Sequence, residues 1–217
     1  RQRQMCIRDR DIKHLTFYDG NHLFYITSAG ISLLNISTSE SRLLYSNTTE
    51  DFFQVPSLYY DDQLKRLWIG TGSAGLFYYD IIRKSLSDIP IRNFPKQPIL
   101  AIRKDAKNTL LIGIDGQGIW NISEKGDTIL HIYKEDLNNP FSLRGDGVYD
   151  ILCDGSKNWI ATFTGKLSFF ENNNSQITPV TYQINNPNSL GNNYVNQIIE
   201  DHEGHIWFAT NLSLIHI

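Results

Sequence analysis

The sequence predicts an all-β protein built from repeated four-stranded antiparallel sheets. A short apolar segment recurs five times in the 217 residues, with equivalent positions at 24, 68, 111, 159 and 207. The period is therefore about 46 residues, which is typical of stacked or radially arranged repeats. Stretches rich in Ile, Tyr, Phe, Val and Trp alternate with clusters of Asp, Asn and Gly, as strands alternate with turns. The apolar residues do not follow the 3.6-residue period of an amphipathic helix.

The five apolar segments align residue by residue. They read LFYIT, LWIGT, LLIGI, NWIAT and IWFAT, at Leu23–Thr27, Leu67–Thr71, Leu110–Ile114, Asn158–Thr162 and Ile206–Thr210. Their second residue is large and apolar, and we expect it to be buried between neighbouring sheets. These repeat anchors are Phe24, Trp68, Leu111, Trp159 and Trp207. In the last four repeats the residue two positions after the anchor is small (Gly70, Gly113, Ala161 and Ala209), which allows another backbone to come close.

Polar residues keep the same register as the anchors. An aspartate stands five or six residues before each anchor, where its carboxylate can accept a backbone N–H in a hairpin turn. These aspartates are Asp19, Asp62, Asp105, Asp154 and Asp201. A glycine stands six or seven residues after the first four anchors, at Gly30, Gly75, Gly118 and Gly165. Because the register explains them, we interpret all of these residues as structural.

The third repeat shows the expected strands best. We predict strands over Ile99–Lys104, Thr109–Ile114, Ile119–Ser123 and Thr128–Lys134, joined by turns rich in Asp, Asn and Gly. Four antiparallel strands in about 46 residues are typical of a β-propeller blade, because radial repetition leaves few exposed strand edges. We therefore predict a partial β-propeller of four blades and the start of a fifth.

The repeat also resembles a known family. The segments Asp201–Thr210 (DHEGHIWFAT) and Leu67–Leu76 (LWIGTGSAGL) are similar to the two-component-regulator propeller repeat. Asn138–Leu143 (NNPFSL) and Asn185–Leu190 (NNPNSL) resemble a connector of the periplasmic sensor regions in Bacteroidetes hybrid two-component systems. The resemblance covers residues 11–210 and implies a fragment of a seven-bladed ring.

The two ends do not fit the repeat. We expect residues 1–10 and 211–217 to be tails that contribute nothing to stability, non-native in the case of 211–217 and non-native or disordered in the case of 1–10. An incomplete ring would expose the apolar faces of its first and last blades, so we expect the isolated chain to self-associate.

The resemblance implies a sensor. Its relatives place propellers on the periplasmic side of the inner membrane, joined by one membrane helix to histidine kinase, receiver and DNA-binding domains, and many sense oligosaccharides released from a polysaccharide. The resemblance also implies that the longer parent protein forms a homodimer. Aromatic and polar side chains of the two connectors suit a sugar ligand. The candidate ligand-binding residues are Phe141, Arg144, Asp146, Asn192 and Tyr194.

Composition excludes other functions. Twenty Lys and Arg stand against 23 Asp and Glu, so no basic surface for nucleic acid is expected. No apolar run approaches the ~20 residues that span a bilayer. Histidine kinase machinery is absent, so we expect no catalysis, no cofactor and no metal in this chain. His202 and His205 lack a third metal ligand at a suitable spacing.

Two other functions stay open. The propeller can be a protein-interaction or dimerisation module, which exposed apolar residues on outer blade edges would favour. It can also be a propeller enzyme such as a lyase or glycosidase, which would need converging carboxylates that the turn aspartates do not supply. The glycines Gly70, Gly72 and Gly75 match a dinucleotide-binding fingerprint, but a strand follows them where that site needs a helix.

Overall fold

A computed structural model describes residues 12–46, 57–163, 167–180, 194–210 and 214–216 of the chain. Within these residues the regular structure consists of nineteen strands in five antiparallel sheets, four with four strands and the last with three. The chain forms two compact units, residues 1–89 with 96–99 and residues 90–95 with 100–217. The predicted all-β fold of four-stranded antiparallel blades is confirmed.

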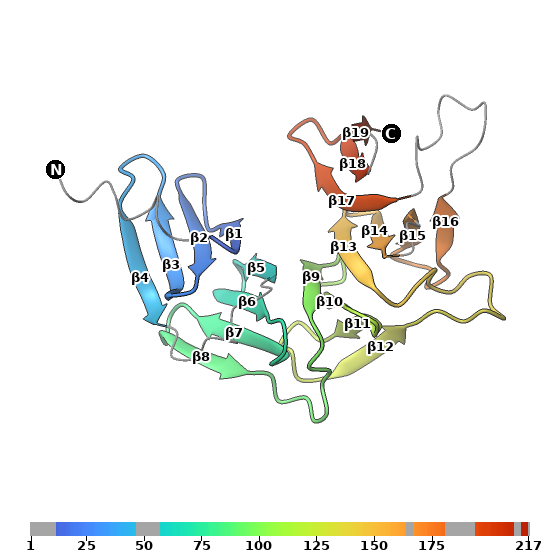
Figure 1. Cartoon of the computed structure of the whole chain (residues 1–217), viewed down its shortest axis with the longest axis horizontal. Coiled ribbons are helices and arrows are strands. Elements are labelled where there is room, and N and C mark those ends of the chain that lie inside the picture. Colours follow the sequence, from blue (N-terminus) through green and yellow to red (C-terminus); the bar gives the residue numbers. More distant parts are fainter. Residues whose placement is uncertain (1–11, 47–56, 164–166, 181–193, 211–213, 217) are drawn as a thin grey trace. The chain divides into compact units, whose positions relative to one another are not determined.

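The first unit contains two blades, each with its strands side by side in chain order (Figure 1). The strands of the first blade are β1 (His14–Phe17), β2 (His22–Thr27), β3 (Gly30–Asn35) and β4 (Ser41–Ser46). Those of the second blade are β5 (Ser57–Asp61), β6 (Arg66–Gly70), β7 (Leu76–Asp80) and β8 (Ser85–Asp88).

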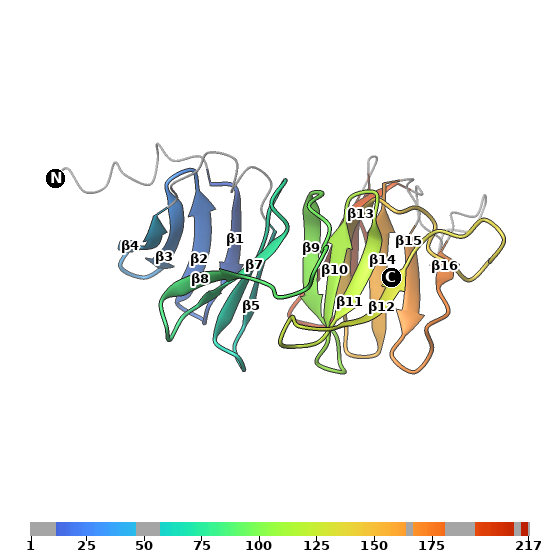
Figure 2. The same cartoon turned by 90° about the horizontal axis from the view of Figure 1, so that it is seen from below.

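The second unit contains three blades, and Figure 2 shows the strands of its first two running along one another. The third blade consists of β9 (Ile99–Lys104), β10 (Leu110–Ile114), β11 (Gly118–Ile122) and β12 (Ile129–Tyr133). The fourth consists of β13 (Val148–Cys153), β14 (Lys157–Thr162), β15 (Leu167–Glu171) and β16 (Thr178–Val180). The fifth consists of β17 (Val195–Glu200), β18 (Ile206–Thr210) and β19 (Leu214–His216).

Strand boundaries in the third blade agree with the sequence prediction to within one residue. The predicted hairpins are also present, since Leu110 pairs with Ile122 and Ile119 pairs with Tyr133. The local signals succeed here because each turn has at most six residues, so neighbouring strands are also neighbours in sequence.

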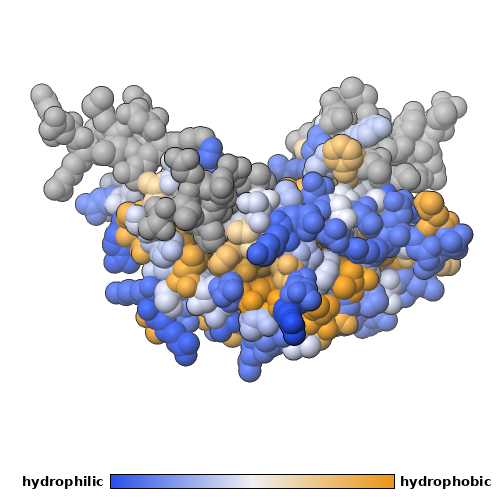
Figure 3. All heavy atoms as spheres, turned by 60° about the horizontal axis from the view of Figure 1, so that its bottom comes forward, coloured by the Kyte–Doolittle hydropathy of each residue, from blue (hydrophilic) through white to orange (hydrophobic). Residues whose placement is uncertain are grey.

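Burial decreases from the second strand of a blade to the fourth. All five residues of β10 are buried, whereas the first four residues of β12 are exposed. A second strand has a partner on each side within its sheet and a neighbouring blade on its faces, so its apolar residues form the core. In the first unit Phe24, Ile26, Leu58 and Leu67 share one such core. On the outside, apolar patches lie between polar ones (Figure 3).

Small residues in the second strands allow close packing, as the sequence suggested. A Cβ atom added at Gly70 would lie 2.6 Å from Ile99 Cγ2, and one added at Gly113 would lie 2.8 Å from Val148 Cγ1. Real Cβ atoms do not come this close to carbon, so a larger residue would push the next strand away.

Strand β19 lies inside the stretch 211–217, which does not fit the sequence repeat. Its residues pair with β18, Leu214 opposite Ala209 and His216 opposite Trp207. Residues 1–10 lie outside the described part of the chain. The dispensability of both ends stays a prediction.

Candidate functional site

An aspartate closes each of the five turns between the first and second strands of a blade. Asp19, Asp105, Asp154 and Asp201 each accept two backbone N–H groups through Oδ1, from residues two to four positions further on, at 2.6–3.0 Å. These bonds satisfy turn donors that the sheet leaves unpaired.

In the second blade this role falls to Asp61 rather than to Asp62. Asp61 is buried and accepts the backbone N–H groups of Gln63 and Leu64 at 3.0 and 3.1 Å. Asp62 is exposed, and its carboxylate accepts from Lys65 Nζ at 2.5 Å and from the Tyr60 hydroxyl at 3.3 Å. The sequence prediction named Asp62, which stands six residues before Trp68, and for this turn it is wrong: Asp61, seven residues before the anchor, accepts the backbone N–H groups.

The second carboxylate oxygen of four turn aspartates receives a side-chain donor, and the donor differs between repeats. Trp159 Nε1 donates to Asp154 Oδ2 and Trp207 Nε1 to Asp201 Oδ2, both at 2.8 Å. The Thr109 hydroxyl takes this place in the third repeat, at 2.9 Å from Asp105 Oδ2. His22 Nδ1 takes it in the first repeat, at 3.0 Å from Asp19 Oδ2.

These bonds change the acidity of the carboxyl groups. The Trp207 N–H, with the backbone N–H groups of His205 and Glu203, lowers the pKa of Asp201 against an opposing effect of burial. Burial raises the pKa of Asp154, but the N–H groups of Lys157, Trp159 and Ser156 outweigh it and leave that pKa below its usual value. Both carboxyl groups are therefore ionised at neutral pH, where they stabilise their turns and cannot donate a proton.

The anchors occupy one position of the second strand in every repeat. Phe24, Trp68 and Leu111 are at most 1% exposed, Trp159 is 9% exposed, and Trp207 is half-buried. Of the four repeat glycines, three begin or immediately precede a third strand with positive φ, at 133° for Gly30, 93° for Gly75 and 73° for Gly118. Gly165 lies outside the described residues.

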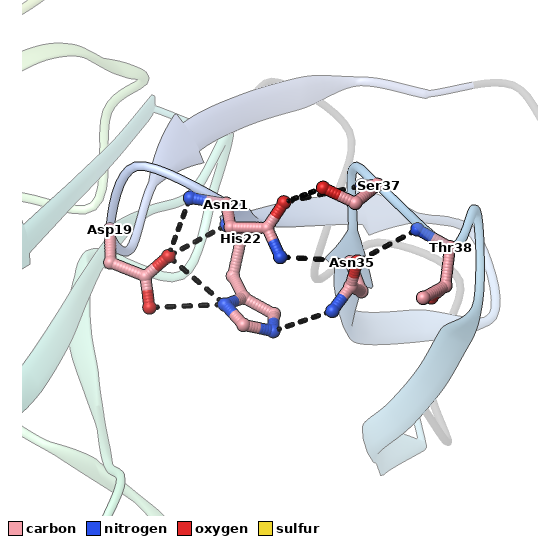
Figure 4. A network of polar contacts seen from close by, with 6 residues as sticks. All are labelled: Asp19, Asn21, His22, Asn35, Ser37 and Thr38. Atoms are coloured by element: carbon pink, nitrogen blue, oxygen red, sulfur yellow. Dashed lines mark hydrogen bonds and ion pairs between the residues drawn. The ribbon is translucent and has the colours of Figure 1, made fainter.

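Six polar residues form a connected network at the turn end of the first blade (Figure 4). Asn35 Nδ2 donates to His22 Nε2 at 3.1 Å, which fits the tautomer with its proton on Nδ1, facing Asp19. Asn35 Oδ1 accepts from Asn21 Nδ2 and from the Thr38 backbone N–H, at 3.3 and 2.9 Å. The Ser37 hydroxyl donates to Asn21 Oδ1. Although Asp, His and Ser are present, the hydroxyl bonds the amide and not the imidazole, so the network braces two turns.

No sequence pattern marks Asp150, which links three blades of the second unit. It is 7% exposed, and its Oδ1 accepts from Arg103 Nη2 of β9 at 3.2 Å. Its Oδ2 accepts the backbone N–H of Ile198, in β17, at 2.9 Å. A β-bulge between Val148 and Asp150 sets the direction of this side chain.

The connector over residues 138–147 holds three of the five candidate ligand residues, and the side chains of two of them bond backbone groups of residues nearby in the chain. Arg144 Nη2 donates to the Pro140 carbonyl at 2.7 Å, and Asp146 Oδ1 accepts the Glu135 N–H at 2.7 Å. These bonds fix the shape of the connector, which makes Arg144 and Asp146 positioning residues.

Phe141, the third of them, lines a cavity of about 310 Å³ beside β12. Its ring is 49% exposed. Polar side chains share the lining with it, among them His131, Asp136, Asn139 and Gln176. An aromatic face next to amide and carboxyl groups is the combination that binds sugar rings and their hydroxyls.

The other two candidates do not join this cavity. Tyr194 is 52% exposed and directly precedes β17. Asn192 lies outside the described residues, as does most of the second connector. The structure therefore brings one of the five candidates, Phe141, to a cavity.

The described residues also bear on metal binding, on cysteine chemistry and on membrane spanning. There, no three His, Cys, Asp or Glu side chains gather closely enough to hold a metal ion. Burial raises the pKa of the Cys153 thiol to about 12, so it is a poor nucleophile. Within the same residues no helix is long and apolar enough to cross a membrane.

Comparison with protein families gives one match. Residues 189–212 match the model of the two-component regulator propeller. This stretch contains the hairpin of Asp201 and Trp207 described above. Among curated protein sequences, none matches this chain.

Solved structures with a similar fold include two bacterial extracellular domains and a bacterial surface component. One is the extracellular domain of BT3049, named as a hybrid two-component system of B. thetaiotaomicron, with TM-score 0.69 and 18% identity over 96% of this chain and 28% of that chain. The extracellular domain of BT4673 from the same organism has TM-score 0.56 and 17% identity over 95% and 34%. PorZ of Porphyromonas gingivalis, described as a component of the type-IX secretion system, has TM-score 0.70 and 16% identity over 95% and 32%.

These similarities establish the β-propeller fold. This chain spans about a third of the length of these three structures.

Proposed function

We propose that this chain, which carries a two-component regulator propeller repeat, is part of the extracytoplasmic sensor region of a hybrid two-component histidine kinase. The proposed parent lies in the inner membrane with this region on the periplasmic side. Its ligand is an oligosaccharide, and its output controls genes of polysaccharide utilisation. The repeat match at residues 189–212 carries the proposal, together with the fold shared with the two extracellular domains.

The cavity beside β12 is the part of the described chain that suits such a ligand best. Phe141 offers a half-exposed ring for stacking on a sugar face, and Asp136, Asn139 and Gln176 stand around it. The bonds of Arg144 and Asp146 to the backbone hold the connector, so the ring is held before the ligand arrives.

Titration calorimetry with oligosaccharides tests this proposal. The 217-residue chain and the complete sensor region would each be titrated with fragments of the polysaccharide degraded by the neighbouring gene products. Replacing Phe141 by Ala removes the stacking ring and should weaken binding roughly tenfold. Leu137→Ala is the matched control, because Leu137 directly precedes this connector, is 92% exposed and does not line the cavity.

Two results would refute the sensing function. One is the absence of any binding tighter than about 1 mM to the complete sensor region. The other is normal induction of the degradation genes after deletion of that region.

A protein-interaction or dimerisation module is the second candidate, and the edge strand β12 favours it. β12 exposes Ile129, Leu130 and Ile132 at 38%, 51% and 38% on the outer edge of its blade, without a charge or proline to block pairing. The corresponding strand β16 has three residues and includes Pro179. Sedimentation should show less self-association for Ile132→Lys than for the control Thr178→Lys in β16. Equal behaviour of the two variants would exclude β12 as the contact.

A further inference from the structure

A second cavity, of about 320 Å³, lies in the first unit between its two blades. Leu33 of β3 and Leu44 of β4 line it from the first blade. Tyr79 of β7 and Ile81, which directly follows β7, line it from the second blade. None of these residues takes part in the cavity beside β12, so the two sites are separate.

The interior of this cavity is apolar and aromatic. Phe24 and Tyr79 are 1% and 2% exposed, and both belong to the core shared by the two blades. The ring of Tyr18 meets the ring of Phe24 edge to face, with centroids 5.2 Å apart. A ligand entering here would contact ring faces and aliphatic side chains of a rigid core, which favours an apolar body.

Two cations stand among the lining residues, and no carboxylate does. Arg42 comes from β4, Lys84 from the turn between β7 and β8, and both are exposed. Among the described residues neither forms an ion pair. Burial raises the pKa of the Tyr79 phenol, while the positive charge of Arg42 acts in the opposite direction. Arg42 and Tyr79 both line the cavity, so a positive charge and the phenol ring share its wall.

The geometry points to a binding site for a small aromatic carboxylate, with its ring against Phe24 and Tyr79 and its anionic group between Arg42 and Lys84. The size fits, because a dry cavity of about 150 Å³ holds a benzene ring. A sugar would leave its hydroxyls unpaired against Leu33, Leu44 and Ile81, and an amine would meet two like charges. The site is independent of the proposed oligosaccharide site.

Three isosteric probes test the charge preference in the 217-residue chain. These are 2-naphthoate, 2-naphthylmethanol and 2-naphthylmethylamine, which share one ring system and differ in charge. By ligand-observed NMR titration we expect a Kd of about 1 mM or tighter for naphthoate. The alcohol should bind roughly tenfold more weakly, and the amine more weakly still. Raising the salt concentration should reduce the difference between the probes.

Substitutions locate the effect. Arg42→Gln combined with Lys84→Gln should make naphthoate and the alcohol bind equally. Arg83→Gln should leave the preference unchanged, because Arg83 is 81% exposed in the same turn, faces Asp80 and does not line the cavity. Leu43→Trp, at the exposed rim, should weaken all three probes. Equal binding of naphthoate and the alcohol to the wild-type chain would overturn the proposal. So would a preference that survives in the double variant, or no binding of naphthoate at 1 mM.

Discussion

The second and fourth repeats have the same four-stranded blade, but different chemistry ties each to its surroundings. In the second repeat Trp68 is fully buried, and its Nε1 has no hydrogen-bond partner among the described residues. In the fourth, Trp159 donates its Nε1–H to Asp154. Ser57 of β5 donates a hydroxyl hydrogen bond to the Ile99 carbonyl, whereas Asp150 of β13 accepts the Ile198 N–H with its carboxylate.

The difference shows that the repeat requires a large side chain at the anchor and a donor–acceptor pair at the turn, but does not fix which atoms pair. The second repeat contacts the first blade through aromatic rings. The ring centroid of Tyr60 lies 4.9 Å from that of Tyr18 and 5.3 Å from that of Phe24. We therefore expect the replacement of a hydrogen-bonding side chain to lower the free energy of unfolding more in the fourth repeat than in the second.

The largest effect is expected at Asp150. Asp150→Ala leaves Arg103 and the Ile198 N–H without their buried partner and should lower the free energy of unfolding by about 3–5 kcal/mol. Ser57→Ala, the equivalent change in the second repeat, should cost about 1 kcal/mol. Urea unfolding followed by circular dichroism measures both. Similar costs for the two variants would remove the distinction between the repeats.

A smaller effect separates the two adjacent aspartates of the second repeat. Asp61→Ala removes the acceptor of two turn N–H groups and should lower the free energy of unfolding by about 1–2 kcal/mol. Asp62→Ala should leave the melting temperature unchanged, because its pair with Lys65 is exposed to solvent. Thermal melts of both variants decide which aspartate closes the turn. A larger loss for Asp62→Ala would reverse the assignment.

The tryptophans sharpen the comparison further. Trp159→Phe and Trp68→Phe remove the same atoms from buried positions, but the first also breaks a hydrogen bond to a carboxylate. We expect Trp159→Phe to cost about 1.5 kcal/mol more than Trp68→Phe. The difference in urea midpoint measures this, and an equal loss would mean that the Asp154 bond adds no net stability.

The smallest effect appears only in acid. The pKa of Asp154 and that of Asp201 are lower in the folded chain than the ordinary value of about 3.9. Their ionised forms therefore stabilise the fold above about pH 4, and this contribution is lost as the pH falls through the lowered pKa. Trp159→Phe should raise the pKa of Asp154 and flatten the acid limb of the stability profile, whereas Trp68→Phe should not. Carboxyl NMR titration between pH 2 and 7 reads the pKa directly.

The sequence by itself determined the repeat, the antiparallel sheets and most turn aspartates. Each of these depends on residues close in the chain: Asp154 bonds residues two to five positions away, and Leu110 pairs with Ile122 across one short turn. Such contacts have a fixed spacing and therefore leave a periodic pattern.

Only the tertiary structure determined which side chains meet at Asp150, at the connector and at the two cavities. Asp150 reaches Ile198 across 48 residues because a β-bulge turns its side chain, and the sequence does not mark the bulge. Arg144 donates to the Pro140 carbonyl and Asp146 accepts the Glu135 N–H, and no sequence pattern marks these contacts. The cavity of Arg42 and Lys84 exists because two blades from separate repeats meet. Contacts of this kind depend on strand register and blade packing, where a shift of one residue changes which side chains meet.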